Sequence, residues 1–221
     1  MNQVTITEKY ALCMLKEKGK LEDSEVKPHL LVSMIVEMML DGNLEITDKN
    51  KVKITSDLPI TPYNKQLYEI IGEMKKDEVP LKTLLTSLCN EWPEKKMKAI
   101  VALFKDSMEK KDLIRLEHKK GLFGEKEVIV INEKQLDHIV EEVRSEFLEK
   151  GALTDDLVLL GALLNSTKFL KSIFTKYEKN ALNSRLKEIK DTEIAEKVKV
   201  ARSVIDDMAA MMIAIVVTTV N

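Results

Sequence analysis

Residues 147–189 constrain the fold of this chain more than any other segment. Asp155 and Asp156 stand where the N-terminus of a helix favours negative charge, and Thr154 precedes them as a suitable N-cap. The apolar residues that follow are too crowded for a surface exposed to water: Leu157, Leu159, Leu160, Leu163 and Leu164. The segment therefore predicts a buried apolar helix, followed by an amphipathic helix and a basic one.

Length and composition favour a single domain. The chain has 221 residues, of which 44% are hydrophobic, and no linker rich in Gly, Ser or Pro divides it. We therefore expect residues 1–221 to share one core. Its 35 basic and 37 acidic residues nearly cancel, so the molecule has no overall field that would draw it to nucleic acid. Any charged binding partner must therefore be bound by a local cluster of charged residues.

The cysteines and the first residues indicate a cytoplasmic protein. Cys13 and Cys89 stand alone among apolar residues at helical spacing, which matches neither a disulfide framework nor a zinc site. Their thiols are expected to behave as small hydrophobes. The opening residues MNQVTITEKY lack the basic and apolar regions of a signal peptide.

The most apolar run of the chain lies near its C-terminus, at residues 208–217 with the sequence MAAMMIAIVV. It is about half as long as the roughly 20 residues that a membrane-spanning helix needs. We therefore expect a central, buried helix rather than a tail anchor.

A short pattern that recurs four times is typical of the end of a helix. In each copy a helical stretch reaches a Gly or a tolerant polar residue, after which an apolar residue turns back towards the core. The copies are LKEKGKL (15–21), MLDGNL (39–44), MEKKDL (108–113) and LEKGAL (148–153).

Helical periods and two alternating patterns fill the segments between these helix ends, which we call helix exits. Residues 27–40 place their apolar side chains on one predicted face, and residues 97–108 do the same. Residues 44–55 and 113–131 alternate as β-hairpins do, while Pro80 and Trp92 with Pro93 mark helix breaks. The fold class that follows is mainly α, one multi-helix domain with small β-hairpins.

The sequence gives little support to catalysis. Its 7 glycines form no phosphate-binding loop, and no cofactor is indicated. His138 has Glu141 and Glu142 at helical spacing, which weakly suggests a metal; a solvated helix face is the favoured interpretation, because a metal needs further ligands. We predict neither catalytic nor metal-binding residues.

The turn of the second hairpin, KKGLFGEK, carries the clearest interaction signal. Leu122 and Phe123 lie at its apex, and each forgoes roughly 1.5–3 kcal/mol of burial if exposed to water. A membrane would accept the two apolar side chains, and a second subunit would cover them equally well. The hairpin folding back on its own domain is the third possibility. The residues around the apex are Lys119, Lys120, Gly121, Gly124 and Lys126, whose lysines suit anionic head groups.

The chain resembles the Golgi phosphoprotein 3 family over most of its length. The resemblance rests on VTITEKYALCMLKEKGKL near the N-terminus, DGNLEI, the Leu-rich helix after residue 154 and the final apolar helix. It implies a mainly helical, non-enzymatic domain that associates peripherally with membranes. It also implies that a hydrophobic hairpin at the place of Leu122 and Phe123 takes part in self-association and membrane contact.

The chain departs from the family at the lipid pocket. Eukaryotic members bind phosphatidylinositol 4-phosphate through a Trp shortly after the first helix and through arginines on later helices. Here KLEDSEVKPHLL follows Gly19, and Met97, Lys98, Ile100 and Ala102 stand where further arginines are expected. A phosphate needs charge-assisted donors that most of these positions cannot supply. We therefore expect a bacterial-type member without selectivity for that head group. The remaining candidates for head-group contacts are Lys98, Lys105 and Arg115.

The predicted function is thus that of a cytoplasmic, peripheral domain that binds anionic or phosphoinositide-type lipid and self-associates. The alternative is a nucleic-acid-binding regulator, since a helix at 27–40 followed by DGNLEITDKNKVKIT resembles the wing of a winged-helix domain. Against it, that helix offers only Lys27 and His29 to bases or phosphates, so no nucleic-acid partner is expected.

Overall fold

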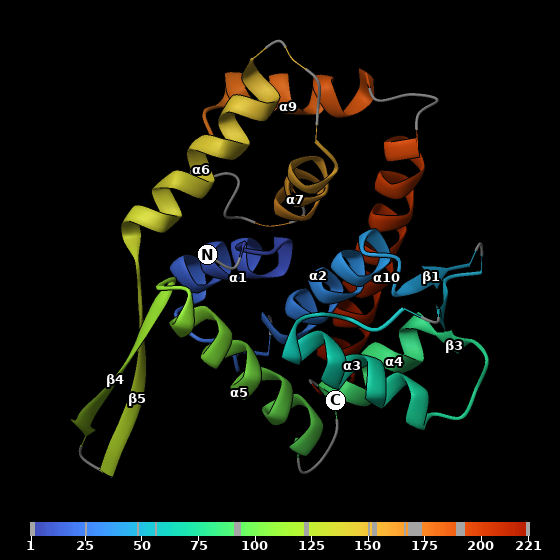
Figure 1. Ribbon diagram of the computed structural model, residues 1–221, viewed down its shortest axis with the longest axis vertical. Helices are drawn as coiled ribbons and strands as arrows, with labels where there is room; N and C mark the ends of the chain where they lie inside the picture. The colour runs from blue at the N-terminus through green and yellow to red at the C-terminus, as the bar shows by residue number, and fades with distance from the viewer. Residues whose placement is uncertain are drawn as a thin grey trace.

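Helices dominate the computed structural model, which describes residues 3–24, 26–47, 49–55, 57–90, 94–121, 124–149, 151, 154–165, 167, 174–188 and 193–219. The described helices are α1 (Ile6–Lys18), α2 (Val26–Leu40), α3 (Pro62–Glu73), α4 (Leu81–Cys89), α5 (Lys95–Lys110), α6 (Glu133–Leu148), α7 (Asp155–Asn165), α9 (Lys176–Glu188) and α10 (Glu193–Thr219). The described strands are β1 (Leu44–Ile46), β2 (Lys51–Ile54), β3 (Val79–Pro80), β4 (Ile114–Gly121) and β5 (Gly124–Ile131). The prediction of a mainly helical single domain with small hairpins is confirmed (Figure 1).

The predicted helix exits coincide with observed helix ends. Helix α1 stops at Gly19, whose φ of 75° is the left-handed conformation that glycine adopts at low cost. The N–H of Gly19 donates to the Leu15 carbonyl at 2.8 Å. Gly42 after α2 and Asp112 after α5 also have positive φ, of 74° and 56°. The fourth exit lies after Leu148, where α6 ends. Backbone geometry at these turns thus follows from short local sequence.

Helix α2 forms the centre of the molecule and corrects the one-sided pattern predicted for it. Besides its apolar residues, Lys27, Ser33 and Glu37 are buried, so nearly the whole circumference of the helix is covered. Helices α1, α4 and α10 pack against it, as Figure 1 shows. A helix buried all round needs partners for its polar side chains, and distant segments supply them: Lys27 Nζ pairs with Glu94 at 2.6 Å.

Helices α7 and α10 complete the core. The Leu-rich helix α7 buries every residue from Val158 to Leu164, as predicted for this segment, whereas Leu157 is only half-buried against the core. Helix α10 packs against α7, α2 and α4 and contributes buried Ala201, Val204 and Met208. The backbone of residues 208–217 is helical; from residue 210 on, their side chains lie outside the described part of the chain.

Two antiparallel sheets lie at the edges of this helical body. Strands β1 and β2 form the first predicted hairpin, and β2 also pairs with β3, a two-residue strand where the sequence indicated only a helix break at Pro80. Strands β4 and β5 form the second predicted hairpin, which projects beyond the helices (Figure 1). In this view the far end of the hairpin diverges from α5 (Figure 1).

Close packing between α6 and α7 predicts that Gly161→Ala destabilises the protein. An added Cβ would lie 2.5 Å from Phe147 Cζ and closer still to Cε2, and Phe147 is fully buried. Such overpacking costs about 1–3 kcal/mol in unfolding free energy. Urea denaturation measures it, with Gly72→Ala at an exposed position of α3 as the matched control, since the nearest contact of the added Cβ would be Ile54 Cδ1 at 3.9 Å. The control should be neutral or stabilised by up to about 1 kcal/mol; equal stability of Gly161→Ala and the parent would contradict the packing.

Candidate functional site

The register of the β4–β5 hairpin sorts its side chains onto two faces. The strands pair from Ile114 opposite Ile131 at the base to Gly121 opposite Gly124 at the far end. Directly opposed residues share a face, and successive residues alternate between faces. The inner face carries the pairs 114/131, 116/129, 118/127 and 120/125, and the outer face carries 115/130, 117/128 and 119/126.

The inner face is turned towards α5. At its base Ile114 is buried, and Leu116 and Ile129 are half-buried against the core. Farther out, Glu127 Oε1 accepts from Lys105 Nζ of α5 at 2.6 Å. These contacts hold the inner face of the hairpin against α5 and the core.

The outer face is basic and partly apolar. Arg115, Lys119 and Lys126 share it with a single carboxylate, that of Glu117. Glu117 accepts from Arg115 at 2.5 Å and lies 3.5 Å from Lys119, yet the side chains of both cations remain more than half exposed, at 71% and 62%. The half-buried Val128 and Val130 are on the same face. The face thus combines a positive excess with an apolar strip.

The remaining predicted residues of the hairpin lie at its far end. Lys120 is exposed on the inner face and lies opposite Glu125 in the register, so the formal charges of the two residues cancel. Lys120 therefore does not belong to the basic outer face. Gly121 and Gly124 face each other in register. Leu122 and Phe123, the predicted apolar apex, lie outside the described residues.

A second predicted set, Lys98 and Lys105, lines a cavity of about 400 Å³ between α5, the hairpin and the segment that follows α1. Lys105 pairs there with both Glu22 and Glu127, and its side chain is only 12% exposed. Burial by itself would lower the pKa of Lys105, but the hydrogen bonds to Glu127 and Glu22 raise it overall. The acidic lining residues outnumber the two lysines: they are Glu22, Asp106, Glu109 and Glu127.

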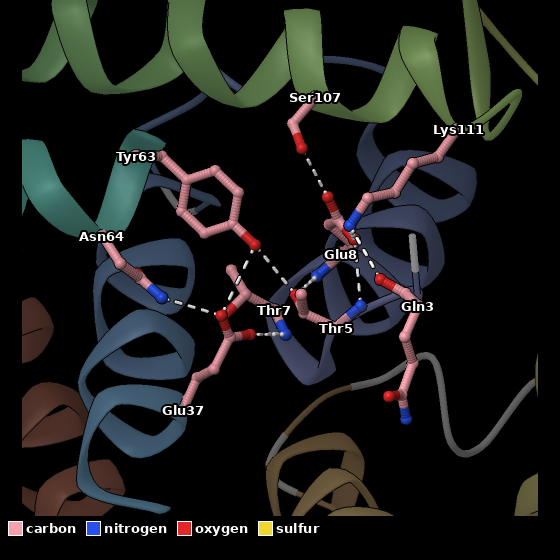
Figure 2. Close-up of polar contacts among 9 residues, drawn as sticks. All are labelled: Gln3, Thr5, Thr7, Glu8, Glu37, Tyr63, Asn64, Ser107 and Lys111. Carbon is pink, nitrogen blue, oxygen red and sulfur yellow. Dashed lines mark hydrogen bonds and ion pairs between the residues drawn. The ribbon is translucent and has the colours of Figure 1, made fainter. Parts of the chain in front are cut away.

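A buried polar network that the sequence analysis did not identify lies at the N-terminus of α1 (Figure 2). The carboxylate of Glu8 has no exposed side-chain surface and is ion-paired to Lys111 at 2.6 Å. It also accepts from Ser107 Oγ at 2.7 Å and from the Thr5 backbone N–H at 2.9 Å. A Thr-x-x-Glu sequence directly before an apolar run is the signature of a capping box, and this signal was present at Thr5 to Glu8.

The second carboxylate of the network is Glu37 of α2, which joins three helices (Figure 2). It accepts from the Thr7 N–H at 2.8 Å, from Asn64 Nδ2 at 2.7 Å and from Tyr63 OH at 3.4 Å. Burial raises the pKa of Glu37, and its hydrogen bonds with Thr5 and Thr7 only partly oppose this shift. Glu37 also lines a cavity of about 380 Å³, together with Asp41 and Lys111.

The network is suited to holding helices together rather than to catalysis. Ser107 donates to the Glu8 carboxylate, which is also ion-paired with Lys111, so the three side chains connect α1 to the C-terminal end of α5. Burial also raises the pKa of Tyr63 and keeps it a neutral hydrogen-bond donor. Each group serves a contact between helices.

One family model matches this chain, that of Golgi phosphoprotein 3 (GPP34), over residues 6–208. The match runs from the first residue of α1 into α10 and includes the hairpin. The chain belongs to the GPP34 family. A search of curated proteins found no match.

Membership in the GPP34 family raises the question of whether the cavity lined by Lys98 and Lys105 suits a phosphoinositide. The resemblance implies that the family's phosphoinositide pocket involves the segment after Gly19 and the helix that includes Met97, and residues of both segments, such as Glu22 and Lys98, line this cavity. Here its lining is acidic, and the half-buried lysine is already neutralised by two carboxylates. A phosphate entering this cavity would have to displace them.

The two cysteines and His138 of this GPP34 protein lie in surroundings typical of structural rather than catalytic side chains. Burial raises the pKa of Cys89 to about 11 and that of fully buried Cys13 further, so both remain thiols at neutral pH. His138 contacts Glu142 at 3.4 Å, and Glu142 is also bound by Lys9. Within the described ranges, no group of three or more potential ligands is placed to hold a metal. The described helices likewise include none with both the length and the apolarity for crossing a bilayer.

The raised pKa of Glu37 predicts how stability depends on pH. In the folded state the Glu37 carboxyl group holds its proton more tightly than in the unfolded state, where the pKa of Glu is about 4.3. The contribution of Glu37 is therefore fully present below that pH and is lost as pH rises through its folded pKa. In Glu37→Gln the side chain stays neutral, so the unfolding free energy of the parent should fall relative to this variant as pH rises from about 4 to 7.

Urea denaturation at several pH values measures this difference, and Glu78→Gln is a control with the opposite sign. A hydrogen bond from Lys51 lowers the pKa of Glu78, so the contribution of Glu78 to stability is lost as pH falls rather than as it rises. If the parent and Glu37→Gln had parallel stability profiles, Glu37 would not hold its proton more tightly in the fold.

Proposed function

We propose that residues 1–221 form one GPP34 domain that binds anionic membranes peripherally, in the cytoplasm, through the outer face of the β4–β5 hairpin. The observation that carries the proposal is the combination on one projecting face of Arg115, Lys119 and Lys126 with Val128 and Val130. Membership in the GPP34 family supports the same role, since family members act at membranes.

The energetics favour contact with an anionic surface. A lysine or arginine near an anionic leaflet contributes about 1 kcal/mol, and three such residues face outward against the one carboxylate of Glu117. Apolar side chains at the interface add to this attraction by leaving water. The predicted apex, Leu122 and Phe123, supplies two large apolar side chains next to the basic residues.

Recognition in this proposal depends on the charge of the lipid rather than on one head group. The cavity at Lys98 and Lys105 is acidic, so it offers no ready set of donors to a phosphoinositide. Phosphatidylinositol 4-phosphate and another anionic lipid at equal surface charge should therefore bind alike. The same altered pocket supports a bacterial-type member of the family.

Self-association through the hairpin is the second part of the proposal. The apex is apolar in sequence, and a second subunit would remove Leu122 and Phe123 from water as a membrane does.

The geometry weighs against the nucleic-acid-binding alternative. In a winged-helix domain, the helix before the wing must enter the major groove. Here the helix before the β1–β2 hairpin is α2, and it is buried on nearly all sides. Its Lys27 is paired with Glu94 inside the protein rather than exposed to a phosphate.

The double variant Lys119→Gln with Lys126→Gln should bind vesicles of phosphatidylglycerol and phosphatidylcholine about thirty-fold more weakly than the parent. The expected loss is about 2 kcal/mol, because two outward charges of about 1 kcal/mol each are removed. Vesicle co-sedimentation measures the affinity, and sedimentation equilibrium of the same variants reports self-association. Folding should be unaffected, since both side chains are exposed.

Two controls separate the proposed face from net charge. Lys65→Gln with Lys82→Gln removes the same charge from exposed positions of α3 and α4, and Lys120→Gln removes a charge from the inner face. Both should bind nearly as the parent does. If the α3 and α4 control weakened binding as much as the hairpin double variant, overall charge rather than this face would control the interaction.

A further inference from the structure

The outer half of the hairpin has little to hold it in place. A two-stranded ribbon is only marginally stable alone and twists readily. At the base, Ile114 is buried and the Asn132 N–H donates to the Leu113 carbonyl at 2.9 Å. Beyond His118 on β4, the described side chains up to the far end are exposed.

One ion cluster reaches past this base. Lys105 of α5 binds Glu127, midway along β5, and at the same time Glu22, in the connection between α1 and α2. The lysine is 12% exposed, whereas the two carboxylates are 45% and 38% exposed. The cluster therefore joins three segments that are separated in sequence, with Glu22 83 positions and Glu127 22 positions from Lys105. Its cation is enclosed, and its anions are open to water.

We propose that Glu22, Lys105 and Glu127 form a latch that fixes the angle of the β4–β5 hairpin to the helical body. With the latch closed, the inner face is held against α5 and the outer basic face points in one direction. When it opens, the hairpin turns about its apolar base at Ile114. The latch itself does not depend on the proposed function. Only one consequence rests on that function, namely that the latch orients the outer face towards a membrane.

The exposure of the anions makes the latch sensitive to salt. Ion pairs with exposed members are screened as the Debye length shortens from about 10 Å at 0.1 M to about 3 Å at 1 M. Hydrated carboxylates can also lose their partner without being stranded in an apolar site. Lys105→Met, which keeps most of the apolar stem, should therefore open the latch and leave the fold intact.

Distances between spin labels test the latch without any lipid. One label is attached at Glu125→Cys near the end of the hairpin and the other at Lys65→Cys on α3, both exposed positions. The background is Cys89→Ser, since Cys13 is fully buried. The parent should give a narrow distance distribution, which broadens in Lys105→Met, in Glu127→Gln and at high salt.

The matched control is Lys110→Met, which breaks an ion pair with Asp106 on the same helix without touching the hairpin. Its distance distribution should equal that of the parent. Unchanged distributions in Lys105→Met and Glu127→Gln, with both variants folded by circular dichroism, would overturn the latch. Because no lipid is present, that result would leave the proposed membrane contact standing, while failure of vesicle binding would leave the latch standing.

Discussion

Two buried carboxylates at the N-terminal end of α1 hold the arrangement on which the rest of the structure depends. Glu8 connects α1 to α5 through Lys111 and Ser107, and Glu37 connects α2 to the start of α1 and to α3. Burial of the Glu8 carboxylate is offset by its ion pair with Lys111, and removing Lys111 would leave an uncompensated charge. Burial of Glu37 is offset by its hydrogen bonds. We infer that this network favours one mutual placement of α1, α2, α3 and α5.

Helix α5 transmits this placement to the hairpin. At its C-terminal end Lys111 follows the helix and binds Glu8, and about two turns earlier Lys105 binds Glu127 of β5. The chain then leaves α5 through Asp112 directly into β4. The direction in which the outer face points is thus set by the buried network as well as by the local register. Register decides which residues form that face, and α5 decides where it points.

Local features of the structure could be predicted from sequence because their causes are local. The exits at Gly19 and Gly42 follow from backbone conformation, and the two hairpins follow from alternation. The burial of α7 follows from its Leu-rich composition. The sorting of hairpin residues onto two faces was also accessible, since it needs only the register that the turn implies.

Features that depend on distant partners could not be predicted. Lys105 was a candidate for head-group contact, yet its partners lie 83 and 22 positions away in sequence, and no local pattern indicates them. The apolar period of α2 gave no sign that Glu37 would be buried, because its donors come from α1 and α3. The capping box from Thr5 to Glu8 was visible in the sequence. The second role of Glu8, as the partner of Lys111, was not.

Hydrogen–deuterium exchange of the unmodified protein, with and without vesicles of phosphatidylglycerol and phosphatidylcholine, tests most directly whether the hairpin face is the membrane surface. We predict that vesicles slow exchange mainly within residues 115–130. Exchange in the buried helices should not change, since the membrane does not reach them. Unchanged exchange in the hairpin, with new protection on another surface such as α9, would contradict the assignment.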